Sequence, residues 1–252
     1  MRNIVKEGVI MLQGIVLSFA AALALERWRP GWRLPRVRGW WPRALAVNVI
    51  QSLLVLAIGV LWQRWWPNVS LLTLPEHWSA WHSGTVAYLA GTFVFYWWHR
   101  ARHQVPTLWR QLHQLHHSAR RMEVLTAFYR HPLEVLSATL LGSAVAYGVF
   151  GLDAACGAIY SLLTAAVQIF IHANVRTPQW LGWFVQRPEM HRIHHRRDHH
   201  ASNYGDIALW DMIFGTYDNP RAWKGHCGFD PRASSAWPRC CCAAMCTRID
   251  RP

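Results

Sequence analysis

The stretch WWHRARHQVPTLWRQLHQLHH, residues 97–117, decides the fold because it joins the end of an apolar segment to five histidines. His99 and His103 are four residues apart, so they project from one face of a helix that continues the apolar segment. Pro106 favours the end of that helix and the start of another. The second helix would carry HQLHH at 113–117, in which the three histidines lie at i, i+3 and i+4 and again share a face.

The composition of the whole chain is typical of a membrane protein. Apolar residues make up 52% of the 252 residues, charged residues only 15%, and there are 17 tryptophans. Segments free of Asp, Glu, Lys and Arg are each about long enough to cross ~30 Å of hydrocarbon as a helix. The sequence therefore predicts an all-α integral membrane bundle of about four transmembrane helices, drawn from residues 8–25, 44–63, 77–98, 135–152 and 154–171.

The distribution of charge predicts how the chain crosses the membrane. The loops at 26–43 and 99–133 each hold six arginines and one glutamate, whereas 64–76 holds one of each. Short cytoplasmic loops collect Lys and Arg, so both arginine-rich loops are expected in the cytoplasm. The net charge of +13 does not predict nucleic-acid binding, because the arginines flank the spans instead of forming a basic helix or a stacking platform.

The second copy of the histidine motif, HRIHH at 191–195, lies on the same predicted side of the membrane as the first, and His172 closes the last apolar segment. Neutral imidazole suits transition metals such as iron, and facing helices can enclose two ions. Interfacial or hydrogen-bonded roles explain a single histidine well but explain nine at helical spacing poorly. We therefore expect a cytoplasmic, helical, histidine-rich cap with a dinuclear site.

Taken together, His-x3-His, His-x2-His-His, RHPLE, His-x-Asn, the second His-x2-His-His, NYG, WD and FGTY resemble the fatty acid hydroxylase or sterol desaturase superfamily. The resemblance covers roughly residues 88–231. It implies a di-iron membrane enzyme in which O2 is used to hydroxylate or desaturate a lipid. The ligands it implies are His99, His103, His113, His116, His117, His172, His191, His194 and His195.

Other polar residues of these motifs receive weaker assignments. The acyl-hydroxylase branch has a further histidine where this chain has Arg176, so the resemblance favours the sterol-desaturase-like branch. Additional ligand or outer hydrogen-bonding roles stay open beside helix capping and surface roles. The residues concerned are His131, His199, His200, Asn174, Asn203 and Asp211.

Three regions are expected along the chain. Residues 1–83 would form a transmembrane hairpin with a basic cytoplasmic loop, 84–231 the catalytic region, and 232–252 a cysteine-rich, disordered tail. The tail lacks the paired Cys-x2-4-Cys form of a structural zinc site.

The resemblance implies two iron ions, which zinc can replace during purification, and O2 as cosubstrate. The expected partners are a membrane lipid and a separate electron-transfer protein or reductase, because the chain has no dinucleotide fingerprint, haem-attachment motif or ferredoxin spacing. The expected location is the bacterial inner membrane with the site facing the cytoplasm. The alternative is a histidine-rich membrane protein that binds or transports metal without oxygenase activity.

Overall fold

The computed structural model describes residues 2–65, 70–199 and 201–229, and no strand is found in these ranges apart from two isolated β-bridges. The long helices are α1 (Arg2–Trp28), α2 (Trp40–Trp65), α3 (Ala80–Gln104), α6 (Pro132–Ser143) and α7 (Ala154–His172). The short elements are α4 (Pro106–Leu108), η1 (Trp109–His113), α5 (Gln114–His117), η2 (Val124–Thr126), η3 (Ala144–Val149), η4 (Gln179–Trp183), α8 (Pro188–His194) and α9 (Ala208–Ile213). The all-α prediction is confirmed.

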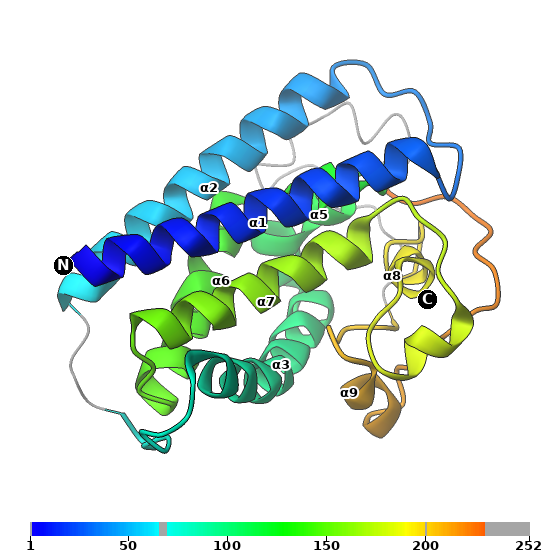
Figure 1. The fold of residues 1–252 in the computed structure, drawn as a ribbon. Helices are drawn as coiled ribbons and strands as arrows, with labels where there is room; N and C mark the ends of the chain where they lie inside the picture. The colour runs from blue at the N-terminus through cyan, green and yellow to red at the C-terminus, as the bar shows by residue number, and fades with distance from the viewer. Residues whose placement is uncertain (1, 66–69, 200, 230–252) are drawn as a thin grey trace.

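The long helices pack as a bundle around α7 (Figure 1). Both α1 and α3 run along α7, and α2 packs against α6. Within the described residues, four helices are long and apolar enough to cross a membrane, in agreement with the predicted number. They cover Gly8–Trp28, Trp40–Ile58, Pro132–Val149 and Ala154–His172.

Helix α3 differs from the expectation that residues 77–98 form one of the spans. It is a continuous helix of 25 residues, but it is not among the four candidate membrane helices. Polar residues such as Ser83 and Thr92 interrupt its apolar sequence, and Arg100 and Arg102 lie near its end. Its length instead carries His99 and His103 beyond the predicted span and into the histidine site.

Local signals explain where the long helices begin and turn. Ser79 caps α3 by accepting the His82 N–H, and Asp153 caps α7 by accepting the Cys156 N–H at 2.8 Å. Between η3 and α7 the chain turns at Gly151, whose φ of +59° favours glycine. Residues 151–153 therefore form a tight turn between η3 and α7.

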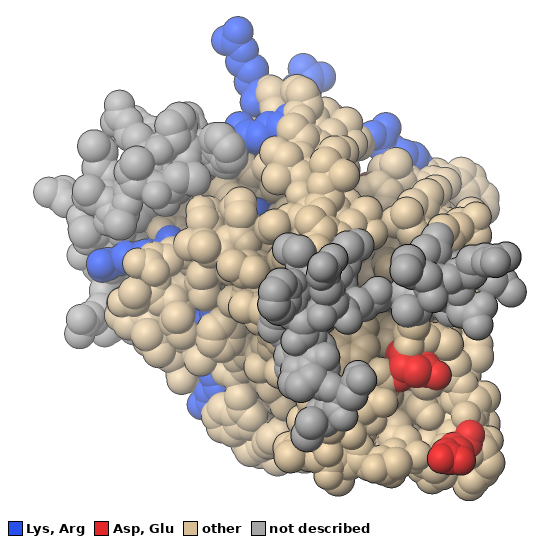
Figure 2. All heavy atoms as spheres, turned by 90° about the vertical axis from the view of Figure 1, so that its left-hand side faces the viewer, with Lys and Arg blue, Asp and Glu red and all other residues tan. Residues whose placement is uncertain are grey.

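The two arginine-rich loops lie at the same end of the bundle. The Gly31 N–H donates to the Asn174 carbonyl at 2.7 Å, and Arg121 donates to the Pro35 carbonyl at 2.8 Å. At the other end, the Leu71 N–H donates to the Gly148 carbonyl at 3.0 Å. Figure 2 faces this other end, and the described part of its surface is mostly uncharged, with Lys and Arg toward its upper and left margins and Asp and Glu at its lower right.

The buried carboxylate of Glu26 holds the C-terminal end of α1 at the histidine end of the bundle. Glu26 is 3% exposed, and its Oε2 accepts the backbone N–H groups of Val124 and Asn174, both at 3.0 Å. A buried carboxylate is costly unless hydrogen-bond donors satisfy it. These two bonds therefore fix the position of α1 relative to the backbone at Val124 and Asn174.

Candidate metal centre

Nine histidines from four parts of the chain form two groups at one end of the bundle. Within each group, one ring nitrogen of every histidine lies within 4.8 Å of those of the others. The five-histidine group contains His99 and His103 from α3, His113 from η1, His117 from α5 and His194 from α8. The four-histidine group contains His116 from α5, His172 from α7, and His191 and His195 from α8 and its C-terminal cap.

Each His-x2-His-His motif is divided between the two groups. His113 and His117, four residues apart, enter the five-histidine group, while His116 enters the four-histidine group. The second motif does the opposite, since its first and last histidines enter the four-histidine group and its middle one, His194, the five-histidine group. Adjacent residues on a helix point about 100° apart, so a motif that ends in two histidines can serve two neighbouring sites.

The two groups are in direct contact. The rings of His117 and His195, one from each group, stack with centroids 4.1 Å apart and an interplanar angle of 8°. The rings of His113 and His116 are also close, at 5.3 Å. Two ions held by these groups would therefore be neighbours, as a dinuclear site requires.

Hydrogen bonds assign the proton of most rings to Nδ1. The Nδ1 atoms of His99 and His194 donate to the carbonyls of Tyr204 and Ser202, both at 2.8 Å. In the same way, Nδ1 of His172 donates to the Gln168 carbonyl at 2.7 Å. A carbonyl oxygen can only accept, so these rings keep the lone pair on Nε2.

The same logic applies to two more members of the four-histidine group. Nδ1 of His116 donates to the Tyr129 carbonyl at 3.3 Å, and Nδ1 of His191 donates to Gln186 Oε1 at 2.6 Å. Outer hydrogen bonds of this kind fix the tautomer and the orientation of metal-bound histidines.

The positions of the Nε2 atoms fit a bound cation. Nε2 of His172 lies 3.2 Å from that of His116 and 3.0 Å from that of His191. All three atoms carry lone pairs, which repel one another at this separation unless a positive charge lies between them. Ligand bonds of about 2 Å separate neighbouring nitrogens by about 3 Å, so the spacing also matches a metal coordination shell.

Burial keeps the site neutral and ready for metal. Seven of the nine histidines are at most 2% exposed, and only His99 and His103 are partly exposed. Burial lowers the pKa of His113, His116, His117 and His191 well below the ordinary value for histidine. Neutral imidazole is the form that binds a transition metal, so both groups can hold metal ions.

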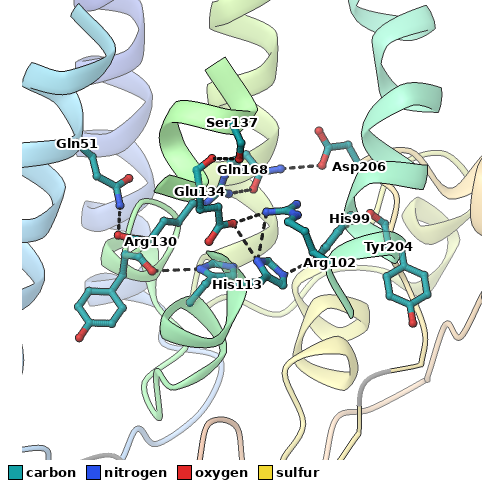
Figure 3. A network of polar contacts seen from close by, with 12 residues as sticks. Gln51, His99, Arg102, His113, Arg130, Glu134, Ser137, Gln168, Tyr204 and Asp206 are labelled. Carbon is teal, nitrogen blue, oxygen red and sulfur yellow. Dashed lines mark hydrogen bonds and ion pairs between the residues drawn. The ribbon is translucent and has the colours of Figure 1, made fainter. Parts of the chain in front are cut away.

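A network of charged and polar groups lies beside the five-histidine group (Figure 3). Arg102 and Glu134 form a buried ion pair, and Glu134 Oε1 also lies 2.9 Å from Nδ1 of His113. Arg130 donates to Gln168 Oε1, and Gln168 Nε2 donates to Asp206 at 2.7 Å. The first set of contacts joins α3 to α6, and the second joins Arg130 and Asp206 to α7.

Of the additional histidines named from sequence, neither described one belongs to a histidine group. His131 lies at the N-terminus of α6, where its Nδ1 accepts the Leu133 N–H at 3.2 Å. His199 accepts from Arg196 at 3.0 Å and bonds Ser202 Oγ at 2.6 Å. The third candidate, His200, lies outside the described residues.

Two of the polar residues named from sequence, Asp211 and Asn203, contact groups that in turn accept a hydrogen bond from a histidine of the site. Asp211 accepts the N–H groups of Tyr204 and Gly205, both at 2.8 Å, and so fixes the carbonyl to which His99 donates. The carbonyl of Asn203 accepts from Gln186 Nε2, and Gln186 in turn accepts from His191.

Asn174 has a different position from the other two. Its side chain bonds the backbone of Trp32 and accepts from Arg192 at 2.8 Å, so it connects the loop after α1 to α8.

Sequence reasoning missed Glu134 and Gln186. Glu134 lies in RHPLE, immediately before an apolar segment, and an ionisable residue at the edge of a span is a signal that could have singled it out. No such signal exists for Gln186, which precedes His191 by five residues and reaches it only through the fold.

Comparisons with known proteins agree with this architecture. The family model described as fatty acid hydroxylase matches residues 84–216, which include all nine histidines. The chain is 31% identical over 159 residues to alkylglycerol monooxygenase of Homo sapiens, covering 61% of this chain and 34% of that protein.

Two further relatives come from a bacterium and a plant. The chain is 30% identical to an ornithine lipid hydroxylase of Rhizobium tropici, over 58% of this chain and 45% of that protein. It is 28% identical to a very-long-chain aldehyde decarbonylase of Oryza sativa subsp. indica, over 53% of this chain and 54% of that protein.

The chain thus matches about a third to a half of the length of these curated relatives. No solved structure matches it. The matching family model spans more than half of the 252 residues and contains the complete histidine site. The chain belongs to the fatty acid hydroxylase family.

Proposed function

We propose that this protein is a membrane-bound di-iron oxygenase that hydroxylates a lipid, or desaturates it, with O2 and electrons from a separate protein. The observation that carries the proposal is the convergence of two groups of neutral, mostly buried histidines at the end of a membrane-type bundle. The relatives' names, monooxygenase and hydroxylase among them, favour hydroxylation over desaturation.

The proposed ligands are the nine histidines of the two groups. Iron bound there would supply the activation of O2 that oxidation of an unreactive C–H bond requires. The protein holds the rings in one tautomer through their outer hydrogen bonds and keeps water away by burying them. Hydroxylation consumes O2, two electrons and two protons and releases one water, so an external reductant is part of the proposal.

A lipid is the proposed substrate because apolar surface lies next to the site. Leu209 and Ile213 of α9 are 47% and 57% exposed, and Trp97 of α3 is 42% exposed. The names of the relatives describe an alkylglycerol, an ornithine lipid and a very-long-chain aldehyde, each with a polar end and an aliphatic part. We infer a substrate of this general form.

Aromatic side chains connect this surface to the histidines. Phe214, which follows α9, packs on Trp97 and Tyr96 with centroids 4.8 and 5.2 Å apart. Tyr96 contacts Tyr204, and the Tyr204 ring lies 5.7 Å from that of His99. An aliphatic chain lying on this surface would be within a few side chains of the five-histidine group.

The test is an assay in lipid nanodiscs with the iron-loaded protein, O2, a competent reductase and total lipid extract. We expect about two iron ions per chain and a lipid product heavier by one oxygen, or lighter by two hydrogens. The rival function, metal binding or transport without oxygenase activity, predicts bound metal with unchanged lipids. Metal uptake into sealed vesicles would then identify a transporter.

We also propose that the histidine end faces the cytoplasm of a bacterial inner membrane, because both arginine-rich loops lie at that end. Single cysteines at Leu71 and at Thr107 mark the two ends and can be compared in a background in which all six native cysteines are replaced by alanine. An impermeant thiol reagent added to intact cells should label position 71 and spare position 107. The reverse pattern would overturn the orientation while leaving the metal site untouched.

A further inference from the structure

The environment of His113 distinguishes it from the other histidines whose outer partners have been given. Four of those rings donate Nδ1–H to backbone carbonyls and His191 donates to an amide oxygen, whereas His113 faces a carboxylate. That carboxylate, Glu134, is 0% exposed and comes from the first turn of α6. A buried charge in this position needs a reason, because burial of an unpaired carboxylate is costly.

Arg102 provides the counter-charge but also competes for the same ring nitrogen. Its Nη1 bonds Glu134 Oε1 and lies 3.2 Å from Nδ1 of His113. Nδ1 cannot both accept from Arg102 and donate to Glu134. The carboxylate is closer, at 2.9 Å, and is the stronger partner, so the proton of His113 belongs on Nδ1.

This tautomer leaves the lone pair of His113 on Nε2, facing the five-histidine group. Nε2 of His113 lies 3.0 Å from Nε2 of His99, whose own Nδ1 donates to the Tyr204 carbonyl. Without the carboxylate, Arg102 could donate to Nδ1 and move the proton of His113 to Nε2, where it would block metal binding.

We propose that Glu134 is a positioning residue of the five-histidine group: it accepts the Nδ1 proton of His113 and so holds Nε2 of His113 as a metal ligand. Arg102 holds the carboxylate in place and balances its charge. The four-histidine group has no such carboxylate among the outer partners described above, so the two metal sites are unequal in their electrostatic support. This inference rests on the proposed metal centre and adds a residue that supports one half of it.

The experiment measures metal content and metal affinity in Glu134→Ala and Glu134→Gln, with the full-length protein in nanodiscs. Loss of an outer carboxylate typically weakens metal binding about 10- to 100-fold. We expect Glu134→Ala to fall from about two ions per chain toward one, with the remaining ion bound as tightly as in the unchanged protein. Glu134→Gln keeps an oxygen acceptor and should lose affinity at one site by about 10-fold.

Asp206→Asn is the matched control. It also removes a carboxylate beside the histidines (Figure 3), but the side chain of Asp206 accepts from Gln168 and not from an imidazole. Its metal content should equal that of the unchanged protein. Equal loss in Asp206→Asn and Glu134→Gln would overturn the proposal, because the effect would then follow from removing any charge of the network.

A double variant separates positioning from folding. Removing Glu134 alone leaves Arg102 unpaired, whereas Glu134→Leu combined with Arg102→Met removes both charges together with the acceptor for Nδ1–H of His113, and should restore thermal stability. We expect the double variant to be stable yet still weaker at one metal site. Full recovery of both metal sites would mean that the pair serves only the fold.

The nitrogen chemical shifts of His113 give a direct readout of its tautomer. In metal-free protein, we expect the Nδ1–H form in the unchanged chain and a shift toward the Nε2–H form in Glu134→Ala. Wild-type metal affinity in both Glu134 variants would overturn the inference. Absence of metal from the unchanged protein would instead overturn the proposed function, so the two failures are distinguishable.

Discussion

The five-histidine group and the four-histidine group lie in contact but are built differently. The first has two partly exposed members, His99 and His103, and is supported by the buried Arg102–Glu134 pair. The second is buried throughout, and the outer partners of His172 and His191 are a backbone carbonyl and an amide. Because two of its members are partly exposed, the five-histidine group is the more accessible of the two from outside the protein.

The largest effect is expected from replacing His116 or His117, which are neighbours in the first motif but belong to different groups. His116→Ala leaves three ligands in the four-histidine group, whereas His117→Ala leaves four in the five-histidine group. Because a site with three ligands holds metal less firmly, we expect a larger loss of metal from His116→Ala and loss of oxygenase activity in both. Metal analysis and product formation provide the measurement. Equal metal loss in both variants would contradict the assignment of His116 and His117 to different metal sites.

Acid should destabilise the metal-free protein through members of both groups. Histidines in the unfolded chain titrate near 6.5, but burial places the pKa of His113, His116, His117 and His191 well below this. The unfolded state therefore binds more protons as the pH falls below about 6.5. Below that pH, the free energy of unfolding should fall by up to about 1.4 kcal/mol per pH unit for each such histidine.

Thermal unfolding of chelator-treated protein between pH 7.5 and 5.5 tests this expectation. Metal-loaded protein is the control and should lose less stability, because bound metal favours the folded state. An unfolding midpoint that does not change with pH in the metal-free protein would show that the histidines are not held neutral by burial.

Gln186 tests the support of the four-histidine group. Gln186→Leu removes the acceptor for Nδ1–H of His191 while keeping the volume of the side chain similar. We expect metal binding in this group to weaken by about 10-fold, the lower end of the range for outer partners, since the partner lost is neutral. Competition with a chelator measures the change.

Gln179→Leu is the control for this change. Gln179 is an amide of η4 that bonds the Asn219 carbonyl at the surface, away from the histidines. The metal affinity of the Gln179→Leu variant should equal that of the unchanged protein. If both variants bind metal as the unchanged protein does, the orientation of His191 does not depend on Gln186.

The smallest expected effect is that of His131→Ala, which tests whether this histidine belongs with either group. The structure makes it the N-cap of α6, so its loss should lower the free energy of unfolding by about 1 kcal/mol, as for other capping residues. Metal content and activity should not change. A loss of one metal ion would identify His131 as a ligand and enlarge one of the groups.

The sequence alone determined the class of the fold and the members of the site. Charge-free segments of membrane length predicted the apolar helices, and helical spacing together with the family resemblance selected nine histidines that the structure brings together in two groups. These properties are local, since hydropathy and the 3.6-residue period depend only on nearby residues. The motif resemblance named the family correctly, while the sterol-desaturase-like branch and the ligand roles stay predictions.

Only the tertiary structure decided how these residues are shared and supported. It sends His116 and His117 to different groups and places Glu134 beside a histidine 21 residues away. Contacts of this kind depend on how distant helices pack and which way their side chains turn, and the spacing of residues along one helix does not contain that information.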